Sequence, residues 1–228
     1  MLIGGLQKTS LIDYPGKVSC IVWTIGCNFR CPWCYNKSLV LGTAKPIDEK
    51  EIFDFLEKRK SLLDGVVITG GEPTIQKDLI SFIKRIREMG YLVKIDTNGS
   101  NPEVIKKLVD EKLVDYIAMD VKASLERYQE VTNSNIDINK ISQSISIIMS
   151  SGIDYEFRTT VVPGLVSKDD VVGIAKLIKG ARHYYLQRYF KAETLDDAYS
   201  NLAPPKRKEL QEMCDAAKPY VECELRGL

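Results

Sequence analysis

The chain has 228 residues, of which 44% are hydrophobic and 28% are charged, and its formal net charge is +1. This composition is typical of a globular protein with enough residues to bury a core, and the balanced charge gives no electrostatic footprint for DNA or RNA. No apolar run approaches the ~20 residues that span a membrane, and the N-terminal residues lack the pattern of a signal peptide. We therefore expect a cytoplasmic protein without nucleic-acid or membrane partners.

Hydrophobic periodicity predicts strands and helices in alternation. Strands are expected at residues 18–25, 65–69, 91–96, 115–121, 155–162 and 183–188. The helices that follow them are expected at 49–63, 78–89, 101–112, 138–151, 167–180 and 204–218. A short strand at 220–225 ends the pattern. The fourth helix is ambiguous, because Ile145, Ile147 and Ile148 are β-branched and also suit a strand.

Six βα units in a row predict an α/β fold with a parallel sheet and outer helices. Eight units would close a full barrel, so six predict a partial (β/α)6 TIM-like barrel, with a doubly wound open sheet as the alternative. We expect one domain over 1–228, with a core at about 17–190 and a C-terminal helix and short strand within 204–225. In βα barrels the chemistry lies at the carboxyl ends of the strands.

Three cysteines follow the first predicted strand at C-x3-C-x2-C spacing: Cys27, Cys31 and Cys34. Thiolates are the ligands of iron–sulfur clusters, which normally take four, so three thiolates leave one iron open. A structural zinc site also needs four ligands, and the single histidine, His183, is distant in sequence. The spacing favours a [4Fe–4S] cluster, with a zinc site or disulfide-forming thiols as alternatives.

This spacing resembles that of the radical S-adenosylmethionine (SAM) superfamily. In that family the open iron chelates SAM, and one electron cleaves SAM to methionine and a 5′-deoxyadenosyl radical. Gly70-Gly71-Glu72-Pro73, after the second predicted strand, resembles the GGEP motif of the same family. The resemblance implies an iron–sulfur oxidoreductase whose cofactors are a [4Fe–4S] cluster and SAM, built on the radical SAM core fold.

Four further motifs resemble a narrower family, the glycyl-radical-enzyme activating enzymes. They are D-x-P-G at 13–16, D-T-N-G at 96–99, D-x-K at 120–122 and R-x-x-V-x-P-G within 158–164. Activating enzymes for pyruvate formate-lyase and anaerobic ribonucleotide reductase are its familiar members. The resemblance implies an anaerobic enzyme that takes hydrogen from a glycine of a partner glycyl radical enzyme, which the anaerobic ribonucleotide reductase exemplifies. An electron donor such as flavodoxin or ferredoxin is also implied.

The resemblance also implies roles for individual residues. The three cysteines of the motif ligate the cluster, and Trp33 packs near adenine. The residues expected to bind SAM are Trp33, Gly70, Gly71, Glu72, Asp96, Asn98, Lys122 and Arg158. A monovalent cation is expected beside the SAM carboxylate, held by Asp96, Thr97 and Asp120 with the backbone carbonyl of Ala118.

The sequence departs from the pyruvate formate-lyase activating enzyme at two places. That enzyme has a SAM-contacting histidine after the sixth strand, where Tyr189-Phe190 stands here, and Gln187 and Arg188 are the candidate replacements. It also has a histidine at the position of Tyr35. The alternatives are a radical SAM enzyme for a small molecule, such as the 7-carboxy-7-deazaguanine synthase family, and, less favoured, an iron–sulfur electron carrier.

Overall fold

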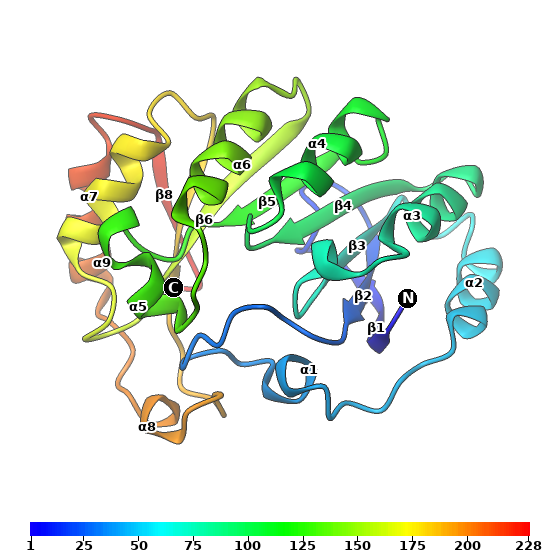
Figure 1. The fold of residues 1–228 in the computed structure, drawn as a ribbon, viewed down its shortest axis with the longest axis horizontal. Coiled ribbons are helices and arrows are strands. Elements are labelled where there is room, and N and C mark those ends of the chain that lie inside the picture. The colour runs from blue at the N-terminus through cyan, green and yellow to red at the C-terminus, as the bar shows by residue number, and fades with distance from the viewer.

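A computed structural model describes residues 1–228 and shows one eight-stranded sheet whose strands lie in chain order (Figure 1). The strands are β1 (Ile3–Ser10), β2 (Ser19–Thr24), β3 (Gly65–Gly70), β4 (Leu92–Thr97), β5 (Tyr116–Asp120), β6 (Asp154–Val161), β7 (Tyr184–Arg188) and β8 (Cys223–Arg226). β1 pairs antiparallel with β2, and all later neighbours pair parallel. β1 and β8 do not pair, so the sheet forms an open, partial barrel, which confirms the predicted fold class.

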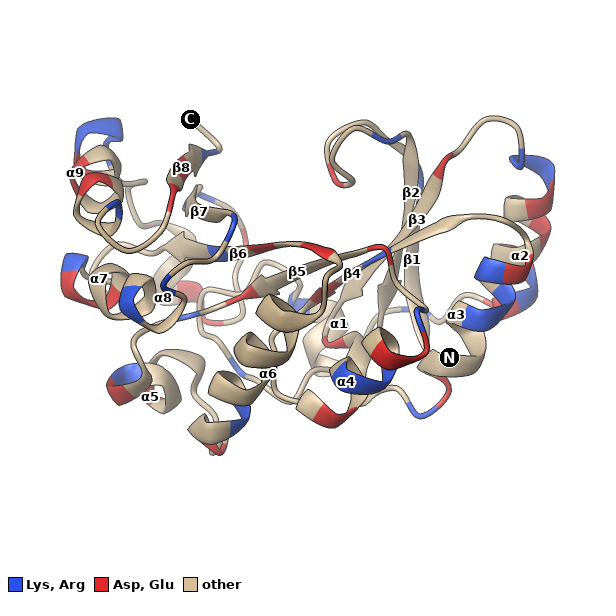
Figure 2. Ribbon diagram, turned by 90° about the horizontal axis from the view of Figure 1, so that it is seen from above, with Lys and Arg blue, Asp and Glu red and all other residues tan.

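Helices cover the convex side of this sheet, as the view in Figure 2 shows for α3, α4, α6 and α7. The helices are α1 (Lys37–Leu41), α2 (Glu49–Lys58), α3 (Leu79–Glu88), α4 (Pro102–Asp110), α5 (Tyr128–Thr132), α6 (Ile138–Ser150), α7 (Lys168–Leu177), α8 (Asp197–Ser200) and α9 (Arg207–Ala217). None of them is long and apolar enough to cross a membrane.

The two faces of the central strands differ in chemistry. Because side chains alternate along a strand, Val93 and Ile95 of β4 face the helices and are fully buried. Lys94 and Asp96 of the same strand alternate with them and face the concave side, where Asp96 lines a cavity and pairs with Lys94. β5 and β6 also carry charged residues (Figure 2). The concave face is therefore lined by ionisable groups, whereas the convex face forms the apolar core.

The predicted strands all exist, but β1 was not predicted. Its sequence contains Gly4-Gly5 and shows no regular alternation, and most of its side chains are partly or fully exposed. An edge strand with one neighbour buries little and leaves a weak sequence signal. The short helices α1, α5 and α8 were missed for a related reason, since four or five residues cannot show helical periodicity.

Helix boundaries also differ from the prediction. α2 begins after its N-cap Asp48, as expected, but ends at Lys58 rather than at residue 63. The chain must turn there because the backbone N–H of Asp64 donates to Val18 at 2.7 Å to begin β3. α6 is a helix, since Ile141, Ile145 and Ile148 fall on one buried face. α9 begins at Arg207, later than its predicted start at residue 204.

Candidate active site

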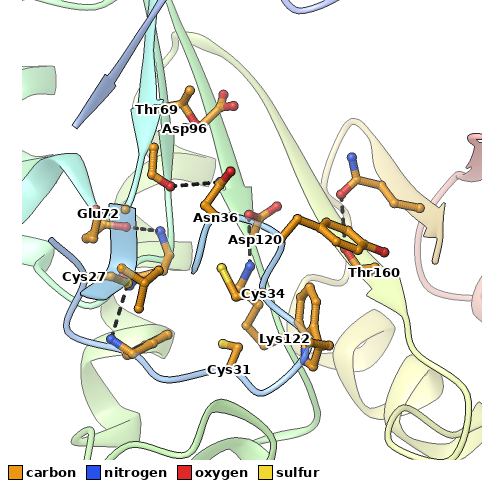
Figure 3. A pocket seen from close by; sticks show the side chains of 18 of the residues that line it. Cys27, Cys31, Cys34, Asn36, Thr69, Glu72, Asp96, Asp120, Lys122 and Thr160 are labelled. Atoms are coloured by element: carbon orange, nitrogen blue, oxygen red, sulfur yellow. Dashed lines mark hydrogen bonds and ion pairs between the residues drawn. The ribbon is translucent and has the colours of Figure 1, made fainter. Parts of the chain in front are cut away.

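A cavity of about 370 Å³ lies at the carboxyl ends of the strands on the concave side (Figure 3). The loops after β2, β3, β4 and β5 build most of its wall. Its lining includes these residues from the sequence prediction: Cys27, Cys31, Trp33, Cys34, Gly70, Gly71, Glu72, Asp96, Thr97, Asn98, Asp120 and Lys122. Arg158 is absent from the lining and lies behind two of these carboxylates, and Ala118 is fully buried within β5.

The cysteine loop leaves β2 through Gly26, whose φ of 95° suits glycine. Inside the loop the backbone N–H of Cys34 donates to the carbonyl of Cys31 at 3.0 Å. A later segment holds the loop from outside, because the N–H of Leu195 donates to the carbonyl of Cys34 at 2.9 Å. These bonds fix the three thiols on one wall of the cavity (Figure 3).

The three cysteines form no disulfide. Burial raises the pKa of Cys27 to about 11 and that of Cys31 to about 12, and it also raises the pKa of Cys34. Metal ligation requires thiolates, so binding must expel the thiol protons. No group of three or more His, Cys, Asp or Glu side chains is arranged around a point for a single metal ion. A cluster does not require such an arrangement, because each thiolate ligates its own iron.

The glycines of the GGEP loop let two loops touch. A Cβ on Gly71 would lie 1.9 Å from the carbonyl oxygen of Gly26 in the cysteine loop. Gly70 has a φ of 119°, and a Cβ there would lie 2.3 Å from the backbone nitrogen of Thr24. The backbone N–H of Glu72 completes the contact by donating to Gly26 at 2.8 Å. Only glycine fits at both positions, so the two glycines allow the backbones of the loops to lie in direct contact.

Glu72 is 1% exposed and its carboxylate accepts four hydrogen bonds from the protein. The donors are the backbone N–H and hydroxyl of Thr74, the hydroxyl of Thr97 and the backbone N–H of Asn98, at 2.6–3.1 Å. Burial outweighs these bonds, so the pKa of Glu72 lies above its usual value. Three of these bonds end on Oε1 and one on Oε2, so Glu72 ties the β3 and β4 loops together.

A network of ion pairs connects charged residues in and behind the cavity wall. The guanidinium of Arg158 lies between Asp120, at 2.8 Å, and Asp96, at 3.3 Å. Lys122 pairs with Asp120 at 3.0 Å, and Lys94 pairs with Asp96 at 2.5 Å. Burial by itself raises the pKa of both aspartates, but the neighbouring cations outweigh it and hold both values below the usual range. The groups are therefore ionised, and the network is rigidly cross-linked.

Aromatic rings form the rest of the wall. Nζ of Lys122 lies 5.1 Å from the centroid of the Trp33 ring, and the buried indole N–H of Trp33 has no hydrogen-bond partner. Tyr35 stacks on Phe190 with centroids 4.2 Å apart, and Phe190 is 56% exposed. Gln187 reaches the same cavity. The two positions at which the sequence departs from the pyruvate formate-lyase activating enzyme, Tyr35 and Phe190, thus both lie at the site.

The cavity has further lining residues outside the motifs, among them Asn36, Thr160, Arg188 and Arg226. Asn36 donates to the carbonyl of Gly70 at 3.2 Å, which adds a link between the first two loops. Arg226 comes from β8, at the end of the chain. No spacing rule connects it to the other residues, so only the sheet topology could reveal it.

Several singled-out residues lie elsewhere. The D-x-P-G segment precedes β2, so it lies at the opposite end of the sheet from the cysteines. Tyr14 of this segment packs against Tyr116, with their ring centroids 6.0 Å apart. Cys20 of β2 is fully buried in the core. Cys214 and Cys223 are also buried, and neither lines the cavity.

Comparisons with known proteins show the family of this chain. The radical SAM superfamily model matches residues 21–178. The chain is 38% identical to a candidate glycyl-radical enzyme activating enzyme of Methanocaldococcus jannaschii, across 97% of this chain and 93% of that protein. It is 31% identical to a 7-carboxy-7-deazaguanine synthase of Thermoplasma acidophilum, across 63% of this chain and 66% of that protein. It is 33% identical to a pyruvate formate-lyase-activating enzyme of Listeria monocytogenes, across 53% of this chain and 52% of that protein.

Solved structures show the same fold. SuiB of Streptococcus suis superposes with a TM-score of 0.65 at 16% identity, covering 91% of this chain and 48% of SuiB, so the chain spans about half of that protein. QueE from Escherichia coli superposes with a TM-score of 0.56 at 15% identity, covering 98% of this chain and 93% of QueE. Taken with the family match and the cavity at the strand ends, these likenesses place the chain in the radical SAM superfamily, as an enzyme related to the glycyl-radical enzyme activating enzymes.

Proposed function

We propose that this protein is an activating enzyme that removes an α-hydrogen from a glycine of a partner glycyl radical enzyme. The observation that carries the proposal is the 38% identity to the M. jannaschii candidate activating enzyme over nearly the full length of both chains. The match to the 7-carboxy-7-deazaguanine synthase covers only 63% of this chain. The D-T-N-G, D-x-K and R-x-x-V-x-P-G motifs support the same assignment.

The lining of the cavity fits a [4Fe–4S] cluster with three protein ligands. Cys27, Cys31 and Cys34 are free thiols on one wall, and no fourth cysteine lines the cavity. When bound, the cluster supplies the electron that cleaves SAM to methionine and the 5′-deoxyadenosyl radical that takes the substrate hydrogen. Nδ2 of Asn98 lies 4.0 Å from Sγ of Cys27. Hydrogen bonds to the sulfurs help to set a cluster's reduction potential, so Asn98 is a tuning residue in this proposal.

The other motif residues bind and orient SAM in this proposal. Lys122 is the contact for the SAM carboxylate, because its ammonium group lines the cavity beside the cysteine loop. Trp33 packs near adenine, and the flexible backbone of Gly70 and Gly71 approaches the amino group. Glu72 acts by holding the loops in place through its four hydrogen bonds. Arg158 acts through the two aspartates that it bridges.

The shape of the cavity supports a substrate that enters from outside. Its volume of about 370 Å³ is at the lower end of the range for a site that holds one drug-sized ligand. SAM is itself a ligand of that size, so little enclosed space remains for a second molecule. Phe190, exposed at the rim, is the residue we expect to meet a loop of the partner. A flavodoxin or ferredoxin is the proposed electron donor.

A radical SAM enzyme for a small molecule is the second candidate function. The identity to the 7-carboxy-7-deazaguanine synthase of T. acidophilum, 31% over 145 residues, is the observation that favours it. The two candidates share the cluster, SAM and the first chemical step. They differ in whether the hydrogen comes from a protein glycine or from a small molecule.

The test is anaerobic incubation of the cluster-loaded protein with SAM, a reductant and a candidate partner grown on α-deuterated glycine. Anaerobic ribonucleotide reductase and pyruvate formate-lyase are the two partners to try. With an unlabelled partner we expect a glycyl radical doublet in electron paramagnetic resonance. With the deuterated partner we expect that doublet to collapse to a single line, because the remaining α-deuteron couples weakly, and deuterium to appear in the 5′-deoxyadenosine. The cluster-free Cys31→Ala variant is the control and should give neither signal.

A different labelling result would decide against the activating function. If a pterin stimulates 5′-deoxyadenosine formation and passes its own deuterium to the product, while neither partner acquires a glycyl radical, the small-molecule function is correct. Release of no 5′-deoxyadenosine under any condition would contradict both candidates.

A further inference from the structure

We propose that Lys94 is a built-in counter-cation for Asp96, so that SAM binding at this site needs no monovalent metal cation. The inference rests on the proposed SAM-binding function of the cavity and adds to it. The cation expected from the family resemblance would need free oxygen atoms on Asp96, Thr97 and Asp120. The arrangement of these residues does not provide them.

Each carboxylate oxygen of the two aspartates already faces a side-chain nitrogen. Oδ1 of Asp96 lies 2.5 Å from Nζ of Lys94, and Oδ2 lies 3.3 Å from Nη1 of Arg158. Oδ1 of Asp120 lies 2.8 Å from Nε of Arg158, and Oδ2 lies 3.0 Å from Nζ of Lys122. The places next to these oxygens that a metal cation would take are held by ammonium and guanidinium groups.

The remaining expected ligands are also engaged. The hydroxyl of Thr97 donates to Glu72 at 2.7 Å and accepts from the backbone N–H of Gly99 at 3.1 Å. Ala118 is fully buried in β5, which pairs with strands on both sides. The Thr97 hydroxyl is thus engaged twice, and Ala118 lies inside a strand that is paired on both sides, so the donor set does not fit a cation.

The charge balance leads to the same conclusion. Four cations (Lys94, Lys122, Arg158 and Arg226) face three carboxylates (Asp96, Asp120 and Glu156), which leaves a surplus of one positive charge. One substrate carboxylate, such as that of SAM, would neutralise this surplus. A metal cation would double the surplus among groups that are mostly buried, and unpaired buried charge is costly.

Lys94 supplies the positive charge beside Asp96 that a metal cation would otherwise bring. Its side chain is 2% exposed, and Asp96 is the only carboxylate with which it forms an ion pair. The two residues are two apart on β4, so they share the concave face of the sheet. A lysine buried in this way is expensive unless paired, and Asp96 is its partner here.

The test measures SAM affinity of the cluster-loaded protein by anaerobic calorimetry. Salts of tetramethylammonium, too bulky to enter between the carboxylates, are replaced by NaCl or KCl at constant ionic strength. We expect the wild-type affinity to change less than about twofold, because screening is equal in these buffers. Lys94→Met should weaken SAM binding about tenfold or more without Na⁺ or K⁺, because a charge-assisted contribution is lost. Added Na⁺ or K⁺ should restore most of that loss.

Two further variants separate this role from a structural one. Lys94→Arg keeps the charge and should stay independent of Na⁺ and K⁺. Lys106→Met removes an exposed lysine from α4 and should behave as wild type. A wild-type protein that loses SAM affinity about tenfold on removal of Na⁺ and K⁺ would overturn the inference, and so would a Lys94→Met variant with wild-type affinity in tetramethylammonium. If Lys94→Met does not fold, the wild-type titration alone decides. Absence of SAM binding by the wild type in every salt would instead contradict the proposed function.

Discussion

At the scale of single residues, Glu72 illustrates how a motif residue can serve the site without touching the ligand. Its four hydrogen bonds come from Thr74, Thr97 and Asn98, on the loops that follow β3 and β4. A buried carboxylate with this many donors gains its stability from the bonds, and each donor would be left unsatisfied without it. The carboxylate is therefore a cross-link between loops that carry different parts of the site.

Glu72→Gln is expected to lower the free energy of unfolding by about 1–3 kcal/mol. The four groups around Glu72 are all donors, and the NH2 group of glutamine cannot accept a hydrogen bond from them. Thermal unfolding would report this as a fall of roughly 2–4 °C per kcal/mol for a chain of this size. The exposed Glu57→Gln is the matched control, and we expect a change within ~0.5 kcal/mol. A Glu72→Gln variant with wild-type stability and no SAM binding would show that Glu72 contacts SAM directly.

At the scale of elements, the site depends on the contact between the cysteine loop and the GGEP loop. Gly71 meets the carbonyl of Gly26 so closely that a single added carbon would overlap it. The two loops follow neighbouring parallel strands, β2 and β3, whose register is continuous up to Thr24 and Gly70. Strand pairing therefore places the two loops at the same edge of the sheet, and the absence of a side chain at Gly70 and Gly71 lets their backbones come into contact.

Gly71→Ala should separate these loops and reduce iron incorporation on reconstitution, because the ideal Cβ would lie 1.9 Å from a backbone oxygen that cannot rotate away. Iron content per chain and the thermal midpoint are the measurements. Gly180→Asn is the control, since no atom lies within 4 Å of its Cβ and asparagine tolerates positive φ. Full iron content in Gly71→Ala would mean that the loops need not touch to bind the cluster.

At the scale of the whole molecule, the last strand secures the interior of the open barrel. Arg226 of β8 makes a bidentate ion pair with Glu156 of β6, with both N–O distances at 2.7 Å. Glu156 is 1% exposed and also accepts a hydrogen bond from Tyr116 at 2.9 Å. The neighbouring cations outweigh burial and hold the pKa of Glu156 below its usual value. The C-terminal strand thus supplies the main partner of a buried charge.

Arg226→Met is expected to cost about 2–3 kcal/mol of stability, somewhat below the 3–5 of a fully buried pair, because its side chain is 35% exposed. The double variant Arg226→Met with Glu156→Gln should recover part of the loss, since the unpaired carboxylate is gone. Denaturant unfolding of the wild type, both single variants and the double variant completes the cycle. Strict additivity of the two substitutions would show that the pair is not coupled.

The sequence alone determined the order of the parallel strands and singled out Cys27, Cys31 and Cys34 as the candidate cluster ligands. Strands such as 65–69 and 91–96 are short apolar runs bounded by turn residues, so local composition is sufficient to find them. The cysteine spacing is a local signal of the same kind. Because parallel strands end at one edge of a sheet, the loops that carry Cys27, Glu72 and Asp120 could also be expected to meet.

Only the tertiary structure decided which charges pair. Glu156 and Arg226 are 70 residues apart, and Arg158 and Asp96 are 62 apart. These partners are set by strand register and by the curvature of the sheet, which no short motif encodes. The same holds for β1, whose edge position leaves a weak pattern, and for the placement of Arg158 behind the cavity rather than in its wall. Local periodicity reflects which face of an element is buried, whereas the partner across the sheet depends on the packing of the whole fold.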